Sequence, residues 1–223
     1  MKPNKIRSIN TKKKIEALLF LLFTIIIPML ISSPLFSISP YNDKDIDDDL
    51  KEKLKLNAPL NARYFDHYKS ITIDHTQVSG ASGLINFPFL ISIFDTDLRF
   101  DVQSDGDDIA FSSNNVWLDH EIEVFDQTYN GTHAKLVAWV RIPALSATID
   151  TVIRMYYGNS TMSSRQNPEG VWDSNYYAVY HMNQDPSSSS VLDSTINNYD
   201  LTPGSGFKSG DLVDGIIGKA IKF

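Results

Sequence analysis

Cysteine is absent from the 223-residue sequence. Its absence excludes disulfides, thiolate metal sites and thiol nucleophiles. The sequence also lacks a glycine-rich phosphate loop, a Ser-His-Asp order on a recognisable nucleophile elbow, and a zinc-binding motif. We therefore predict a protein without enzymatic activity that relies on its hydrophobic core for stability.

Basic residues are scarce after residue 40. Six of the 20 Lys and Arg residues precede residue 41, but only one of the 27 Asp and Glu residues does. The remaining 14 basic and 26 acidic residues give the rest of the chain a net charge of −12. Because such a surface repels a phosphate backbone, we predict that the protein does not bind nucleic acid.

The amino terminus has the pattern of a targeting or anchoring segment. Residues 1–14 carry six basic residues and no acid, and the apolar run over residues 17–38 is 22 residues long, whereas one bilayer crossing needs about 20. The candidate cleavage positions near Ser33 and Ser39 are each followed by proline, which favours an uncleaved signal anchor over a cleaved signal peptide. We expect a cytoplasmic amino terminus, a transmembrane helix over residues 15–38, and the remainder outside the cell.

The chain after the anchor changes from charged to strand-like. Residues 39–63 are dense in charge and predict a solvated acidic stalk. From residue 64 on, short runs of Ile, Val, Phe and Tyr alternate with Gly, Asn, Asp and Pro, a pattern typical of β-strands. Over residues 64–172 we predict an all-β fold, an antiparallel β-sandwich of jelly-roll type. Pro88 predicts that its strand starts there or lies at a sheet edge.

The stretch LDHEIEVFD, residues 118–126, places acids at every second position of one strand. The YNGT that follows predicts a hairpin, with a three-residue loop from Tyr129 to a left-handed Gly131. This register gives one apolar face, from which only His120 departs, composed of Leu118, Ile122, Val124, Leu136, Ala138 and Ile142. The opposite face would carry Trp117, Asp119, Glu121, Glu123, Trp139 and Arg141, with Asp119 directly across from Arg141.

Three interpretations of that opposite face stay open. Acids on one strand face lie about 6.6–7 Å apart, and retaining glycosidases hold their two carboxyl groups about 5–5.5 Å apart, so Glu121 or Glu123 could act as nucleophile or acid. The trio is similar to the carboxylates of laminarinase-type glucanases, although the order here is Asp, Glu, Glu instead of Glu, Asp, Glu. Alternatively, Trp117 and Trp139 stack on a glycan. We favour a plain solvated face whose tryptophans are covered by a neighbouring loop or module.

Three other groups have both a structural and a functional interpretation. We predict that His120 is a hydrogen-bonded core histidine and not a metal ligand or base. Asp105, Asp107 and Asp108 suit a calcium ion, but an Asp-Gly turn before a strand has the same composition, and we favour the turn. No other cofactor is expected. Asn130 and Asn159 begin glycosylation sequons, and both lie at predicted turns.

The strings SDGDDIAF, LDHEIE, AWVRIP, MYYGN and GVWDSNY, in this order, resemble the prokaryotic domain of unknown function numbered 2341 over about residues 64–172. The resemblance implies an extracytoplasmic β-domain of surface proteins or of proton-channel-type envelope complexes, and it supplies no catalytic residues. Residues 173–223, with YHMN, DSTINNYD and DGIIGKAIKF, resemble the opening of a laminin-G or concanavalin-like module. Such sandwiches usually need more than about a hundred residues, so this module is either truncated or packs on the preceding domain.

Together these features predict a membrane-anchored, outward-facing cell-surface protein that binds a glycan or another protein. Two alternatives belong to other classes of protein. One is a fragment of a carbohydrate-active enzyme that uses Glu121 and Glu123, and the other is an accessory domain of an envelope transport complex.

Overall fold

The computed structural model of the chain describes residues 36–38 and 62–223. The strands are β1 (Phe36–Ile38), β2 (His67–Ile73), β3 (Leu84–Asp95), β4 (Ala110–Ser113), β5 (Val116–Leu118), β6 (His120–Asp126), β7 (Ala134–Leu145), β8 (Thr151–Tyr157), β9 (Leu212–Asp214) and β10 (Lys219–Ile221). The helices have three or four residues each: η2 (Ala62–Tyr64), η3 (His75–Gln77), α3 (Asp97–Phe100), α4 (Pro168–Val171) and η4 (Ser209–Asp211).

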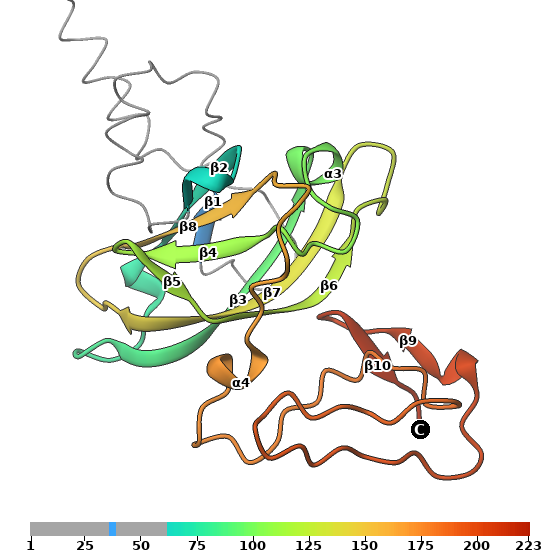
Figure 1. Cartoon of the computed structure of the whole chain (residues 1–223). Helices are drawn as coiled ribbons and strands as arrows, with labels where there is room; N and C mark the ends of the chain where they lie inside the picture. Colours follow the sequence, from blue (N-terminus) through green and yellow to red (C-terminus); the bar gives the residue numbers. More distant parts are fainter. Residues whose placement is uncertain (1–35, 39–61) are drawn as a thin grey trace, which may run out of the picture.

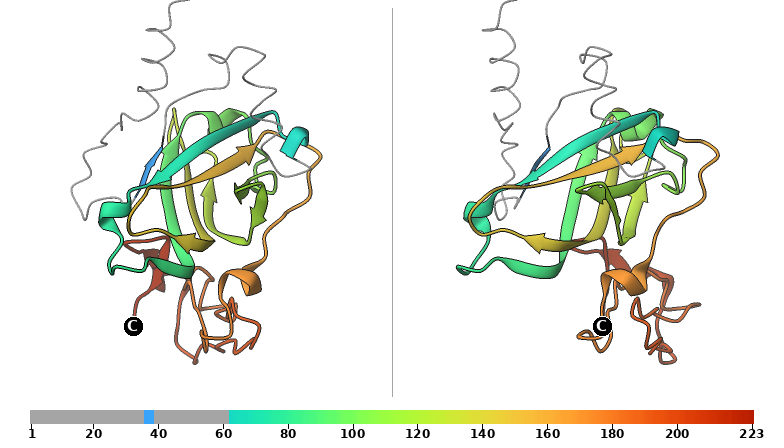
Figure 2. Two further views of the ribbon diagram at one scale, coloured as in Figure 1. Left: turned by 90° about the vertical axis from the view of Figure 1, so that its left-hand side faces the viewer. Right: turned by 60° about the vertical axis from the view of Figure 1, so that its left-hand side comes forward.

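Two antiparallel sheets form the body of the protein. One sheet has the strand order β1-β2-β8-β4-β5 and the other the order β3-β7-β6, while β9 and β10 form a separate pair. The two sheets lie as layers, with the chain after β8 running below them (Figures 1 and 2). The predicted all-β, antiparallel class is therefore confirmed, and the arrangement is sandwich-like.

The core lies between the two sheets and follows the alternation of the sequence. Every second residue of β2, β3, β7 and β8 points inward, because successive side chains of a strand face opposite sides. The buried side chains from both sheets pack into one cluster that includes Ile71, Ile73, Phe89, Ile91, Ile93, Phe111, Leu136, Ala138, Val140, Ile142, Ile153 and Met155. Full burial of one such large side chain contributes about 1.5–3 kcal/mol.

The register between β6 and β7 departs from the predicted one at a single residue. From His120 to Ile122 the strands pair as predicted, with Ile122 opposite Ala138. The predicted pairing of Leu118 with Ile142 is wrong, because Leu118 lies on β5 and pairs with Phe111 of β4. Glu123 is an extra residue, a β-bulge, and the pairing is shifted after it. Phe125 then packs against the core. The predicted core-facing position of Val124 is wrong, because one inserted residue reverses which side chains point inward.

The connection between β6 and β7 is also longer than predicted, and covers residues 127–133. The side-chain oxygen of Asn130 accepts hydrogen bonds from the backbone N–H groups of Thr132 and His133, each at 2.8 Å. Gly131 does not adopt a left-handed φ. The predicted three-residue loop is wrong, because an asparagine side chain shapes this turn in place of a left-handed glycine.

Pro88 lies within β3, which is an edge strand of its sheet. The predicted edge position is confirmed. The strand does not start at the proline, since it already begins at Leu84. An edge strand accommodates proline because one side of it needs no hydrogen-bond donor.

Most of the predicted anchor lies outside the described residues. Of the helix predicted over residues 15–38, only Phe36–Ile38 is described, and it forms β1, which pairs with β2. The predicted helical state of these three residues is wrong. The stalk predicted over residues 39–63 likewise lies outside the description, apart from its last two residues in η2. Within residues 36–38 and 62–223, no helix has the length and apolar character that a membrane crossing requires.

Two isoleucines on β3 test the position of the core. Ile91 is fully buried, whereas Ile85 is 79% exposed. We expect Ile91→Ala to lower the free energy of unfolding by about 2–5 kcal/mol, because it leaves a cavity between the sheets. The matched variant Ile85→Ala should change it by less than about 0.5 kcal/mol. Urea denaturation of both variants measures the difference, and equal effects would contradict the described inward face of β3.

Candidate functional site

The acidic face of β6 and β7 is not in water. The chain that follows β8, residues 167–194, runs across it, and we call these residues the cover (Figure 1). The covered face consists of Asp119, Glu121, Glu123, Trp139 and Arg141. Glu123 is only 9% exposed. The interpretation of these acids as a solvated face is wrong, because the cover supplies donors that replace water.

A histidine of the cover lies between the two glutamates. His181 Nε2 is 3.0 Å from an Oε atom of Glu121, and its Nδ1 is 3.1 Å from an Oε atom of Glu123. The side chains of Glu121, His181 and Glu123 are 12%, 9% and 3% exposed, respectively. An imidazolium with both N–H groups donated can thus join both carboxylates at one protected position.

Further donors complete the surroundings of both glutamates. Trp172 Nε1 donates to Glu121 Oε2 at 2.6 Å, and the hydroxyl of Ser194 donates to Glu121 Oε1 at 2.6 Å. Trp139 Nε1 donates to Glu123 Oε2 at 2.8 Å. Two charges removed from water require such partners, because an unpaired buried carboxylate is costly.

These contacts determine the charge state of the cluster. Burial disfavours the charged form of His181, but hydrogen bonds and the negative charges of both glutamates outweigh it and raise its pKa to about 9. Burial also raises the pKa of Glu121, yet the hydrogen bond and charge of His181 lower it overall. At neutral pH His181 is therefore protonated and Glu121 is ionised. A general acid of a glycosidase needs a raised pKa instead, so Glu121 is poorly suited to that role.

Aromatic rings surround the cationic imidazole. The rings of Trp139 and Trp172 lie 5.2 Å apart between centroids, and the ring of His181 lies 6.2 Å from Trp139 and 5.9 Å from Trp172. A protonated ring beside an indole gains additional electrostatic stabilisation. The expectation that a neighbouring segment covers Trp139 is confirmed.

The remaining polar residues of the covered face also contact the cover. Arg141 donates to the carbonyl oxygen of Gly170 at 3.0 Å and pairs with Asp173 at 3.3 Å. Asp119 accepts from the side-chain amide of Asn167 at 2.8 Å. Asp119 and Arg141 lie across from each other, as predicted, and their backbones are hydrogen-bonded. The two side chains do not pair with each other, because each contacts a partner in the cover.

Trp117 belongs to a different surface. It lies on β5 in the five-stranded sheet, where its ring is 5.7 Å from that of Phe65 and 5.4 Å from that of Tyr156. The guanidinium of Arg165 stands 4.6 Å above the centroid of its ring. The prediction that Trp117 and Trp139 share one face is therefore wrong, since β5 and β6 belong to different sheets.

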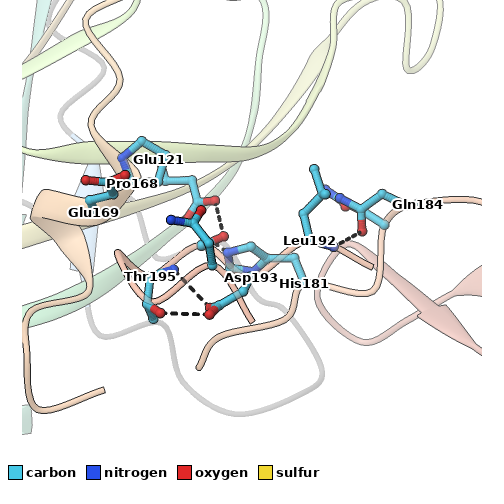
Figure 3. A pocket seen from close by; sticks show the side chains of 11 residues that line it. Glu121, Pro168, Glu169, His181, Gln184, Leu192, Asp193 and Thr195 are labelled. Atoms are coloured by element: carbon cyan, nitrogen blue, oxygen red, sulfur yellow. Dashed lines mark hydrogen bonds and ion pairs between the residues drawn. The ribbon is translucent and has the colours of Figure 1, made fainter. Parts of the chain in front are cut away.

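A pocket of about 280 Å³ lies beside the ion cluster (Figure 3). Carboxylates, amides, hydroxyls and one imidazole line it, from Glu121, Glu169, His181, Asn183, Gln184, Asp193, Ser194, Thr195 and Asn198, together with Pro168 and Leu192. The side-chain oxygen of Asn183 is buried without a hydrogen-bond partner among the described residues. The wall of the pocket thus includes a residue with an unsatisfied acceptor.

Asp193 organises the wall of this pocket. Its carboxylate accepts from the backbone N–H groups of Val179, Thr195 and Tyr199, at 2.9, 3.0 and 2.9 Å, and from the Thr195 hydroxyl at 2.9 Å. Burial raises the pKa of Asp193, but these hydrogen bonds lower it overall. The carboxylate therefore serves to hold the loop of the DSTINNYD motif.

The three predicted calcium ligands do not converge on one point. Asp108 is buried, and its carboxylate accepts from the backbone N–H groups of Gly158 and Asn159 at 3.1 and 2.8 Å. The side chain of Asp105 accepts from the N–H of Asp107 at 3.1 Å, as in an Asp-Gly turn. In the described part of the chain, the only group with metal-binding geometry is Asp74, His75 and Asp150.

His120 lies in the core, as predicted, with 1% of its surface exposed. Its Nδ1 is 3.5 Å from the carbonyl oxygen of Leu118, and its ring meets the edge of Phe111 at 5.3 Å between centroids. Burial lowers its pKa to about 4, so the imidazole is neutral at physiological pH. The residue therefore packs as an uncharged side chain.

The two sequons differ in accessibility. Asn130 is exposed, and its side-chain oxygen accepts from Thr132 within the turn. Asn159 is half-buried, and its side-chain nitrogen, the atom that would carry a glycan, donates to the carbonyl oxygen of Tyr64 at 2.7 Å. Of the two, Asn130 is the better acceptor for modification.

The sequence interpretation missed the residues of the cover. His181, Trp172 and Ser194 lie 60, 51 and 73 positions from Glu121, so no local spacing connects them with the glutamates. The available signal was indirect. One face of the predicted strand pair carries acids and a tryptophan, and the segment that follows is too short to form its own core. Together these two features suggest that the segment packs on that face.

The raised pKa of His181 predicts how the cover responds to pH. The stabilisation from its positive charge is fully present below the unfolded value of 6.5 and is lost as the pH rises through about 9. The contribution of Glu121, whose pKa is lowered, is present above 4.5 and is lost at more acidic pH. We expect a change in the fluorescence of Trp139 and Trp172 with a midpoint near pH 9, measured by titration from neutral to alkaline pH. The variant His181→Gln should not show this transition.

Loss of the imidazole should leave two buried carboxylates without a counter-charge. We expect His181→Ala to destabilise docking of the cover by about 3–5 kcal/mol. Limited proteolysis at neutral pH should then cut within residues 173–194 while the sandwich stays intact. The half-buried His133 gives a control, since His133→Ala removes a histidine from the β6–β7 loop instead. Equal protease resistance of both variants would contradict the clamping role of His181.

The β9–β10 pair also rests against the covered face. A Cβ atom at Gly218, whose φ is +58°, would collide with Oε1 of Glu123, whereas one at Gly204 meets nothing within 4 Å. We expect Gly218→Ala to cost about 1–3 kcal/mol, because either the strand pair or the ion cluster has to shift. Gly204→Ala should be nearly neutral, and urea denaturation measures both.

Comparison with known proteins gives one family. Residues 97–197 match the family model described as Domain of unknown function (DUF2341). No curated protein and no solved structure matches the chain. The matched range begins at α3 and continues past α4 into the cover, so it includes both glutamates and His181. The match supports the relation to the DUF2341 family that the sequence motifs indicated, over a segment in which the covered face and its cover occur together.

Proposed function

We propose that this chain is a non-enzymatic, membrane-anchored protein of the cell surface. In this proposal the β-sandwich lies outside the cell. The cover and the residues that follow the cover, docked on the sandwich, bind a glycan. The predicted anchor and the acidic character of the chain after residue 40 support the location. The polar side chains that line the pocket beside the ion cluster support the proposed class of ligand.

The observation that carries the proposal is the use of Glu121 and Glu123 as partners of His181. Their oxygens accept hydrogen bonds from two indoles, a hydroxyl and an imidazole, all from the same chain. Carboxylates in this arrangement join two parts of a protein. A glycosidase would need one of them protonated and both directed at a sugar.

The pocket has groups suited to a hydroxyl-rich ligand. Amides and carboxylates accept and donate hydrogen bonds in several directions, and the side-chain oxygen of Asn183 is unpartnered. A sugar hydroxyl is a donor of the right strength for such an oxygen. Because the net charge is negative, neutral or amino sugars are favoured over acidic ones.

We further propose that residues 173–223 are a laminin-G- or concanavalin-like module. Support comes from the DSTINNYD loop that Asp193 holds, from the bridges that pair Tyr180 with Asp193 and Val191 with Leu201, and from the β9–β10 pair. These residues rest on the sandwich, in agreement with the expectation that they pack on the preceding domain.

Glycan-array binding of the full-length chain tests the proposal. We expect binding to neutral or amino glycans that weakens about tenfold in Asn183→Ala, which corresponds to about 1.4 kcal/mol, roughly one hydrogen bond. Asn175→Ala is the matched control, because Asn175 is exposed and does not line the pocket. Absence of any glycan signal would contradict the binding function. Turnover of a glucan that Glu121→Gln abolishes would instead establish the glycosidase alternative.

A protein partner is the second candidate function. Ile196, Ile216 and Phe223 of the carboxyl-terminal segment are 62%, 97% and 94% exposed. Apolar side chains that gather in one exposed segment are typical of an interaction surface. Co-purification with a proton-channel subunit, lost when Ile216 is replaced by a charged residue, would support an accessory role in an envelope complex.

A further inference from the structure

A lysine occupies a core position of β2. The strand alternates so that Lys69, Ile71 and Ile73 face the other sheet, and Lys69 is only 8% exposed. Lysine is rarely buried to this extent without a partner. Its Nζ reaches Asp95, the last residue of β3.

The partner is an aspartate at the equivalent place on the opposite sheet. Phe89, Ile91, Ile93 and Asp95 form the inward face of β3, and Asp95 is 9% exposed. Its Oδ2 contacts Lys69 Nζ directly. The other oxygen, Oδ1, accepts from the backbone N–H groups of Asp97 and Leu98 at 2.9 and 3.1 Å. The carboxyl group is therefore held in one orientation, toward the amine.

A second acid touches the same amine. Asp97 Oδ2 lies 3.1 Å from Lys69 Nζ and accepts from the Tyr157 hydroxyl at 3.4 Å, while the Tyr157 ring centroid is 5.7 Å from Nζ. The Asp97 side chain is 28% exposed, so it connects the protected pair with solvent. Burial raises the pKa of Asp97, but the hydrogen bond and charge of Lys69 lower it overall, so this side chain is an ionised carboxylate beside the amine.

We propose that Lys69 and Asp95 condense to an intramolecular isopeptide bond, with Asp97 as the residue that transfers protons. A buried ion pair contributes little to stability, because the desolvation of both charges offsets their attraction. Conversion of the pair into a neutral amide removes both charges from the core. A covalent bond would then join Lys69 to Asp95.

The reaction balances without any cofactor. The ammonium of Lys69 first gives one proton to Oδ2 of Asp95, which yields a neutral amine and a carboxylic acid. Nζ attacks Cγ of Asp95, and Asp97 takes a second proton from the nitrogen. Asp97 then returns that proton to the Oδ2 hydroxyl, which leaves as water as the C–O bond breaks. One N–C bond has formed, one water is released, and Asp97 is regenerated.

The backbone around α3 favours this attack. Negative charge develops on Oδ1 when the tetrahedral intermediate forms, and the N–H groups of Asp97 and Leu98 already point at that oxygen. Preorganised donors at a developing oxyanion lower the barrier of acyl transfer. Proximity contributes as well, because the amine and the carboxyl group are held in contact by two rigid sheets.

The product would connect the two sheets of the sandwich. Lys69 lies in the five-stranded sheet and Asp95 in the three-stranded sheet, 26 positions apart. Such a link restricts the unfolded chain in the way a disulfide does. In a chain without cysteine it is a covalent alternative for use outside the cell.

Peptide mapping of the full-length chain tests the bond directly. In the segment from Tyr64 to Arg99, trypsin can cut only after Lys69 and Arg99, and a lysine bound in an amide is not cut. We expect one peptide covering residues 64–99, lighter than its sequence mass by one water molecule, with fragments that locate the link at Lys69 and Asp95. A missed cleavage would keep the full mass. A succinimide at Asp95 would lose water but still release residues 64–69.

Two variants and an internal control complete the experiment. Asp97→Asn should release residues 64–69 and 70–99 as separate peptides of full mass, while Asp101→Asn, at an exposed position near His67, should retain the link. The exposed ion pair of Lys219 and Asp214, at 2.7 Å, should remain cleavable after Lys219. Release of both peptides at full mass from the unmodified chain would show that Lys69 and Asp95 form only an ion pair. A link that persists in Asp97→Asn would overturn the role of Asp97.

Discussion

The positive charge on His181 decides whether the residues after β8 stay on the sandwich. Glu121 and Glu123 lie on the outer side of the three-stranded sheet, where two carboxylates would normally be solvated. Removed from water, they need a cation, and the imidazole lies 3.0 and 3.1 Å from them. The rings of Trp139 and Trp172 and the lining of the pocket are arranged around this imidazole. Without the cation, the cover would bury two like charges at close range.

This arrangement gives the three-stranded sheet two covered faces of different chemistry. The inner face packs apolar side chains against the five-stranded sheet, and the outer face holds a network of ion pairs and hydrogen bonds. The stability of apolar packing changes little with pH, whereas the outer network depends on the charge of His181 and its carboxylate partners. The sandwich can therefore persist under conditions in which the cover leaves it. A protein built in this way would present its carboxyl-terminal segment in a defined position on a stable sandwich.

Lys69 and Asp95 are a second case of charged side chains held away from water, here inside the core. Both occupy positions that alternation assigns to apolar side chains, and they meet at the end of the sandwich where α3 begins. The Glu121–His181–Glu123 cluster remains an ionic contact, because imidazolium and carboxylate form no stable bond. A primary amine beside a carboxyl group can condense instead. The two clusters thus represent two ways in which a chain without cysteine holds distant segments together.

The sequence by itself determined the class of fold and the inward faces of its strands, since alternation of side chains is a local property. It correctly indicated the edge position of Pro88, the burial of His120 and the pairing of Ile122 with Ala138. It also indicated the relation to the DUF2341 family that the match over residues 97–197 supports. Local pattern missed the bulge at Glu123, because an inserted residue changes the register without leaving a mark in composition.

Only the tertiary structure decided the environment of the acids. Whether a carboxylate on an outer face lies in water or against a histidine depends on where the chain goes 60 residues later. The same holds for Lys69 and Asp95, whose strands belong to different sheets. Contacts between residues far apart in sequence are set by the packing of whole elements, and neither spacing nor periodicity records them. The physical reason is that electrostatic and hydrogen-bond partners act through space, whereas strand propensity acts along the chain.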